Sequence, residues 1–157
     1  MELPVADVEQ TLRDLLGCAV TVRAGGITRE KRGLAAVYTD GAGAQVAVLW
    51  LDHSLAAYAG GSLATVPAES LGMAIDATVL PENLREKVAE VFSVLAPHVT
   101  AGGRVELDKV IVTPPAPAEI QALISKAHDR RWLTIEVSGY GAGAAVMVSA
   151  RSVPSAA

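Results

Sequence analysis

The sequence predicts an α+β fold, in which an antiparallel-rich sheet of about six strands has helices packed on it. Two pairs of strand-like segments, within Leu34–Leu51 and Trp132–Ser149, are each separated by a glycine-containing turn, which is typical of hairpins. The segment Pro81–Leu95 has the spacing of an amphipathic helix. The chain has 157 residues, of which 51% are hydrophobic and 19% are charged, so one domain with a sizeable core is expected.

The first half of the chain is expected to form a helix, a strand and a hairpin. Apolar residues in Val5–Leu16 fall on one helical face, with Pro4 suited to the first turn and Gly17 to the end of the helix. A short strand, Ala19–Arg23, leads into a polar connection, Gly25–Arg32. The first hairpin follows, with strands expected at Leu34–Thr39 and Gln45–Leu51 and a turn between them at Asp40–Gly43.

Two short helical segments are expected between this hairpin and the long helix. Asp52 is suited to be the N-cap of a small helix that runs through Ala59 and is ended by Gly60 and Gly61. Pro67 opens a second helical stretch, which ends near Ala74.

The second half repeats this order of elements, beginning with the long helix. Apolar residues recur at positions i, i+4, i+7, i+8 and i+11 of that helix, namely Leu84, Val88, Val91, Phe92 and Leu95. A strand at Arg104–Val112, a proline-rich corner at Pro114–Pro117 and a helix at Ala118–Ala127 are then expected. The second hairpin follows, with strands at Trp132–Val137 and Ala144–Ser149 and a turn at Gly139–Gly143. We therefore expect two pseudo-twofold halves within one domain, residues 1–151, followed by a flexible tail, residues 152–157.

Charge and composition exclude several classes of function. The 13 basic and 17 acidic residues give a net charge of −4, which disfavours binding to nucleic acid. Cys18 and the histidines His53, His98 and His128 lack the spacing of metal ligands, so no metal is expected. The sequence contains no segment that predicts a membrane span and no signal peptide, so a cytoplasmic location is expected.

Two short motifs are similar to catalytic or cofactor motifs but lack their context. The glycines of Gly139–Gly143 follow a strand, yet no helix follows them to hold a pyrophosphate, so no nucleotide cofactor is expected. Asp52–Ser54 contains the residue types of a serine-hydrolase triad, but adjacent residues cannot converge on one reacting atom.

The long helix also has a polar face that points away from its apolar face. At about 100° per residue, Glu86, Glu90 and Ser93 fall together with Pro97 in a sector of about 60° opposite the apolar one. Glu90 and Ser93 are three residues apart, so their side chains are neighbours on the helix surface. From the residue pattern alone, the ordinary interpretation of this face is a solvated helix surface.

This arrangement resembles the CheC/CheX family of chemotaxis phosphatases, which share a fold with the middle domain of the flagellar switch protein FliM. The similarity covers roughly Val5–Ser149 and rests on the order of the elements, on the segment Leu49–Ala59 and on the long helix. The resemblance implies a site on the outer face of that helix. In the family, an acidic or serine residue lies one turn before a Glu, an Asn lies one turn after it, and a proline lies further along the chain.

Carried over to this sequence, Glu86 takes the first place, Glu90 the place of the Glu and Ser93 the place of the Asn, while the prolines of residues 114–117 lie in the region of the distal proline. In the family the Glu pairs with a lysine of the response regulator, and the Asn orients the water that attacks the phosphoryl group. The resemblance therefore implies that Glu86 and Glu90 bind the partner, and that Glu90 and Ser93 hold the catalytic places. Ser93 departs from the family pattern, and its hydroxyl reaches less far than a carboxamide.

The leading hypothesis is a CheX-like protein that docks a phosphorylated, CheY-like response regulator and has weak or lost aspartyl-phosphate phosphatase activity. One alternative is a non-enzymatic signalling or flagellar scaffold, in which Glu90 and Ser93 are ordinary solvated residues. Another is a small-molecule-binding domain that uses the Tyr58–Ala64 or Gly139–Gly143 loops. A homodimer is also expected, because both hairpins are hydrophobic and carry few edge charges.

Overall fold

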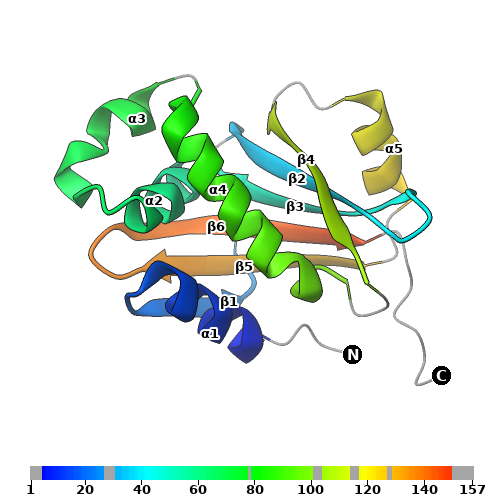
Figure 1. Ribbon diagram of the computed structural model, residues 1–157, viewed down its shortest axis with the longest axis horizontal. Helices are drawn as coiled ribbons and strands as arrows, with labels where there is room; N and C mark the ends of the chain where they lie inside the picture. Colours follow the sequence, from blue (N-terminus) through cyan, green and yellow to red (C-terminus); the bar gives the residue numbers. More distant parts are fainter. Residues whose placement is uncertain are drawn as a thin grey trace.

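A six-stranded sheet forms the centre of the computed structural model, which describes residues 5–26, 31–77, 79–100, 104–113, 117–126 and 129–149 (Figure 1). The strands are β1 (Val20–Ala24), β2 (Gly33–Thr39), β3 (Gln45–Asp52), β4 (Glu106–Thr113), β5 (Asp129–Val137) and β6 (Gly141–Ser149). The α-helices are α1 (Val5–Leu16), α2 (His53–Leu63), α3 (Gly72–Asp76), α4 (Glu82–Leu95) and α5 (Ala118–Ser125), and the 3₁₀ turns are η1 (Ala68–Ser70) and η2 (Ala96–His98). These elements confirm the predicted α+β class.

The order of the strands across the sheet has a twofold pattern. It runs β1-β5-β6-β3-β2-β4, and every neighbouring pair is antiparallel. The order is symmetric about its centre: β6 and β3 are the two central strands, β5 and β2 lie outside them, and β1 and β4 are at the two edges. Each of these pairs joins corresponding strands of the two halves. The two hairpins therefore meet at the centre, and the lone strand of each half pairs with the hairpin of the other half. The predicted pseudo-twofold arrangement is thus present in the topology.

This topology removes the reason given for a homodimer. The hairpins were expected to have unpaired edges, but β4 covers the outer edge of β2 and β1 covers the outer edge of β5. The open edges of the described sheet belong instead to β1 and β4. The periodicity of a hairpin does not reveal which strand from elsewhere in the chain will pair with it.

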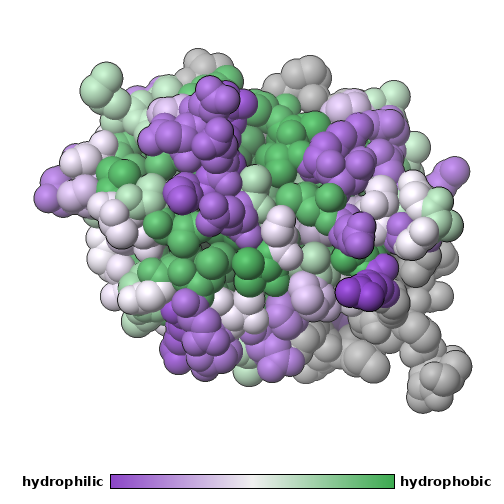
Figure 2. All heavy atoms as spheres, in the orientation of Figure 1, coloured by the Kyte–Doolittle hydropathy of each residue, from purple (hydrophilic) through white to green (hydrophobic). Residues whose placement is uncertain are grey.

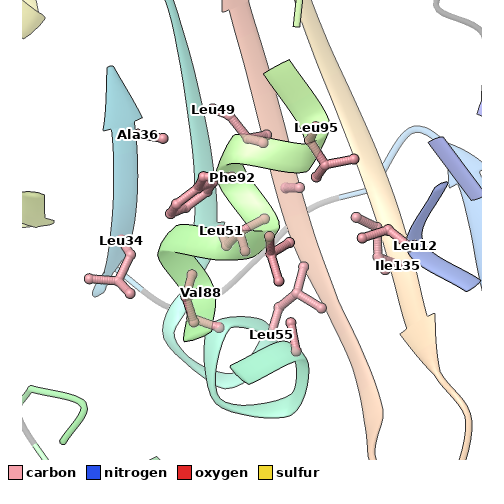
Figure 3. Packing of buried hydrophobic residues seen from close by; sticks show 14 of the residues in the cluster. Leu12, Leu34, Ala36, Leu49, Leu51, Leu55, Val88, Phe92, Leu95 and Ile135 are labelled. Carbon is pink, nitrogen blue, oxygen red and sulfur yellow. The ribbon is translucent and has the colours of Figure 1, made fainter. Parts of the chain in front are cut away.

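Three helices cover one face of the sheet and enclose the main core. Figure 1 shows α4 crossing this face, with α1 and α2 beside it. Figure 3 shows Val88, Phe92 and Leu95 pointing from α4 towards sheet residues such as Leu49 and Leu51. The predicted apolar face of the long helix is fully buried in this core. The opposite face of the sheet has a smaller apolar cluster, over which α5 packs.

Helix α2 extends beyond its predicted end. It was expected to end at Gly60 and Gly61, but it continues through both glycines to Leu63. A Cβ atom on Gly60 would lie 2.9 Å from the carbonyl oxygen of Leu84, and one on Gly61 would lie 2.7 Å from the Leu71 side chain. The glycines are therefore explained by the close packing of α2 against α4 and against Leu71, not by the end of a helix.

Replacing Gly60 by alanine should consequently lower the free energy of unfolding by about 2 kcal/mol, because an overpacked helix contact forces the backbone apart. Elsewhere in a helix the same substitution raises stability by about 1 kcal/mol. Gly72→Ala in α3 is the matched control, because nothing lies within 4 Å of a Cβ atom there. Urea unfolding of both variants measures the difference, and equal effects would contradict the close-packing explanation.

Other boundaries differ from the predicted ones by a few residues. Strand β5 begins at Asp129 and not at Trp132, and β6 begins at Gly141 and not at Ala144, because their pairing continues from one end of the hairpin to the other. Helix α5 ends at Ser125, earlier than the predicted Ala127. Strand β4 begins two residues later than predicted and ends one residue later. Residues 27–30, 114–116, 127–128 and the predicted flexible tail lie outside the described residues.

Candidate partner-binding face of helix α4

Helix α4 is fixed to the sheet by a buried hydrogen bond near its C-terminal end. The last turn of α4 tightens into η2, where Pro97 has no N–H group and the backbone N–H of Ala96 donates to the backbone carbonyl oxygen of Ser93. The hydroxyl of Tyr38 on β2 donates to the carbonyl oxygen of Phe92 at 2.7 Å. Burial raises the pKa of the Tyr38 hydroxyl well above its usual value, so the group stays protonated and keeps this bond at neutral pH.

Both ends of α4 have further attachments. At the start, Arg85 donates from Nε to the carbonyl oxygen of Leu80 at 3.0 Å. After the end, Nε2 of His98 in η2 lies 3.0 Å from the hydroxyl of Thr11 in α1. The buried apolar face of α4, with the bonds from Tyr38 and to Thr11, sets the orientation of the helix and so determines which residues face outward.

The predicted outer face of α4 is exposed. Glu86, Glu90 and Ser93 are all solvent-accessible, and Figure 2 shows a hydrophilic band along the helix. The Nζ atom of Lys87 lies 3.7 Å from Oε1 of Glu90, with 39% and 55% of the two side chains exposed. Lys87 is not among the predicted site residues, although its i, i+3 spacing from Glu90 predicts such a pair.

A cleft of about 240 Å³ lies between α4 and the sheet, beside this outer face. The residues that line it from the helix are Glu82, Arg85, Glu86 and Ala89, and those from the sheet are Leu34, Val110 and Val112. Figure 2 shows apolar surface next to the hydrophilic band of α4. The cleft depends on how α4 packs against a strand far along the chain, which no local pattern in the sequence indicates.

The chemistry available on this face is that of carboxylates, a hydroxyl and the ammonium group of Lys87. Glu86 and Glu90 can accept hydrogen bonds from a lysine or arginine, and the Ser93 hydroxyl can donate and accept. Within the described ranges, no group of three or more His, Cys, Asp or Glu side chains could hold a metal ion. No helix in those ranges is long and apolar enough to cross a membrane.

The other sequence-predicted sites lie on other elements wherever the structure describes them. Of the distal prolines, Pro117 precedes α5, and the prolines at 114 and 115 lie outside the described residues. The proposed small-molecule loops are mostly regular structure. Helix α2 continues to Leu63, and in the second segment only Gly139 and Tyr140 form a turn, because Gly141 and Gly143 belong to β6. A Cβ atom on Gly141 would lie 2.8 Å from the Tyr58 ring, so this glycine allows α2 to pack against the sheet.

Comparison with known proteins identifies the fold. No protein-family model matches the chain, and no curated protein matches its sequence. Three solved structures with matching chains are T. maritima FliY, the H. pylori FliM–SpeE complex and the B. burgdorferi CheX–CheY–BeF3–Mg complex. Their TM-scores are 0.55, 0.62 and 0.54, at sequence identities of 13%, 8% and 12%.

These similarities extend over most of both chains. FliY matches over 90% of this chain and 81% of its own. The corresponding shares are 92% and 80% for the FliM–SpeE structure, and 94% and 98% for the CheX–CheY structure. At such low identities the similarity shows the fold alone. The chain has the fold that CheC/CheX proteins share with the middle domain of FliM, as the sequence resemblance predicts.

Proposed function

We propose that this protein docks a phosphorylated, CheY-like response regulator through the outer face of α4. The observation that carries the proposal is the exposure of Glu86, Glu90 and Ser93 together on the helix where the CheC/CheX resemblance requires them. The fold supports it, because one structure with a similar chain is a CheX–CheY complex. In this proposal, Glu86 and Glu90 bind the partner, and Glu90 and Ser93 are the residues at the catalytic positions of the family.

The ion pair between Lys87 and Glu90 is compatible with docking. An exposed pair at this spacing contributes only about 0.3–0.5 kcal/mol, so a lysine of the partner can replace Lys87 at little cost. The cleft beside Glu86 offers room for an apolar side chain of the same partner. Ser93 reaches less far than asparagine, so we expect phosphatase activity to be weak or absent.

A second candidate function is a non-enzymatic scaffold in signalling or in the flagellum. It is favoured by the similar chains in structures of FliY and of FliM, one of them a FliG–FliM complex. In this case Glu90 and Ser93 would be ordinary solvated residues, and Glu90→Ala would leave every partner interaction unchanged.

Glu90→Lys should weaken binding to the phosphorylated regulator about tenfold, because it places like charge against the partner's lysine. The experiment is a binding screen against the receiver domains of the host, with and without beryllofluoride as the acyl-phosphate mimic. Glu136→Lys is the matched control, because Glu136 is exposed on β5, outside α4. A loss of equal size in both variants, or in neither, would contradict docking through Glu90.

Two further expectations concern the protein as a whole. We propose a cytoplasmic location, in line with a response-regulator partner. We also propose a homodimer, now through the open edges of β1 or β4 in the described sheet. A single-chain mass in light scattering would rule out the homodimer.

A further inference from the structure

The sheet face opposite α4, which we call the rear face, is only partly covered. Its apolar residues include Ala35, Val37, Val48 and Val148, and α5 packs over these. Helix α5 has only eight residues. Much of the sheet beside it therefore has no helix among the described residues, in contrast to the face under α1, α2 and α4.

A cavity of about 280 Å³ lies between α5 and the rear face. It is lined almost entirely by carbon, with Val48 and Val146 contributed by the sheet, Ile120 and Ile124 by α5, and Trp50 by β3. Its volume is just below the range of about 300–1,000 Å³ that is usual for small-molecule pockets. It therefore suits a short acyl chain or a single ring.

The Trp50 side chain is held in place as one lining of this cavity. Its Nε1 donates to the hydroxyl of Thr113 at 3.0 Å, and that hydroxyl donates to the carbonyl oxygen of Gly33 at 3.3 Å. A Cβ atom on Gly33 would lie 2.5 Å from the indole, so the glycine makes room for the ring. Trp132 contacts Trp50 edge to face, with ring centroids 6.5 Å apart. The indole N–H is satisfied, and a ligand would meet the ring as apolar surface.

One positive charge lies at the edge of this apolar surface. Lys31 lies at the cavity itself and is exposed. Strand alternation places Arg130 on the same face as Trp132, and the pairing of Arg23 with Thr134 places it there too. The same alternation places Glu136 on this face, so the charges away from the cavity are mixed. Lys31 is therefore the charge that a ligand in the cavity would meet. An apolar cavity with a lysine at its edge complements a molecule with an apolar body and an anionic head.

We propose that this cavity binds a small amphipathic carboxylate, with its apolar body against Trp50 and Ile124 and its carboxylate facing Lys31. The site lies across the sheet from the outer face of α4 and is independent of the proposed regulator docking. It also differs from the two glycine-rich segments considered in the sequence analysis.

Intrinsic fluorescence can test this proposal directly, because Trp50 and Trp132 are the only tryptophans in the chain and both lie on the rear face. Octanoate and 1-octanol are the probes, since they share an apolar body and differ in charge. Both should change the fluorescence saturably, and octanoate should bind about fivefold more tightly, as one exposed ion pair allows. The proposal would be overturned if neither probe gave a saturable change in fluorescence, or if octanoate and 1-octanol bound with equal affinity.

Two variants locate the binding. Lys31→Met should reduce the affinity for octanoate to that for octanol, while Lys87→Met, on α4, should leave the difference intact. Ile124→Glu should abolish octanoate binding, because it places a carboxylate in the cavity. Val146→Phe fills the same space without adding charge, so it keeps the test valid if Ile124→Glu does not fold. Binding that persists in a folded cavity variant, or a preference for octanoate that survives Lys31→Met, would overturn the assignment.

Discussion

Replacing Ser93 by asparagine is expected to increase phosphate release from a bound, phosphorylated receiver by up to about a hundredfold. The serine hydroxyl is one bond from Cβ, whereas a carboxamide places its oxygen and nitrogen one bond further from α4. In the proposed complex, the side chain at position 93 holds the attacking water in line with the phosphorus. A water that lies about 1 Å from the productive position lowers the rate of hydrolysis about a hundredfold. The position is exposed, so the larger side chain does not disturb the core.

The measurement is phosphate release over time from receiver domains of the host that have been phosphorylated with acetyl phosphate. Ser125→Asn is the matched control, because Ser125 is exposed on α5 and lies outside the proposed face. Adding Glu90→Ala to Ser93→Asn should remove most of the gain, since the water is positioned only in the docked complex. If Ser93→Asn binds a receiver normally but hydrolyses it no faster than the control, position 93 does not orient water.

The features that the sequence predicted well depend on neighbours within one element. The apolar spacing from Leu84 to Leu95 depends only on the period of a helix, so both the buried face and the exposed face of α4 followed from it. The N-cap role of Asp52 likewise depends on a residue three positions away, and the structure confirms it.

The features that the sequence analysis missed depend on contacts between distant elements. Gly60 was interpreted as the end of a helix, because nothing in α2 itself indicates that Leu84 will lie against it. The cleft beside Glu86 and the cavity beside Trp50 are likewise formed by segments far apart in the chain. Strand pairing was missed for the same reason: β1 and β4 join hairpins of the opposite halves, and local periodicity contains no information about register across such distances.

Asp52→Ala should have the largest effect on stability, a loss of about 3 kcal/mol in the free energy of unfolding. Asp52 is 4% exposed. Its Oδ1 accepts from the backbone N–H of Leu55 at 2.8 Å and its Oδ2 from that of Ala144 at 2.9 Å. One side chain thus caps α2 and ties the helix to β6. Gly143 permits this approach, since a Cβ atom there would lie 2.6 Å from Oδ1.

Removing the carboxylate leaves two backbone donors without this acceptor, and both bonds are buried. The lost cap contributes about 1 kcal/mol, and an unsatisfied buried N–H costs a further 1–3 kcal/mol or so. Asp52→Asn should lose roughly half as much, because a carboxamide keeps one acceptor oxygen and presents a donor to the other N–H. Urea unfolding monitored by circular dichroism measures each difference.

Asp40 provides the comparison that separates burial from hydrogen bonding. Its Oδ1 also accepts from two backbone N–H groups, those of Ala42 and Ala44, but on the exposed turn between β2 and β3. Water can replace the carboxylate there, so Asp40→Ala should lose less than about 1 kcal/mol. Equal losses for Asp40→Ala and Asp52→Ala would mean that the bonds themselves, and not their burial beneath α2, determine the stability. A much larger loss at Asp52 would instead show that the stability depends on the burial of these two bonds, which tie the start of α2 to β6.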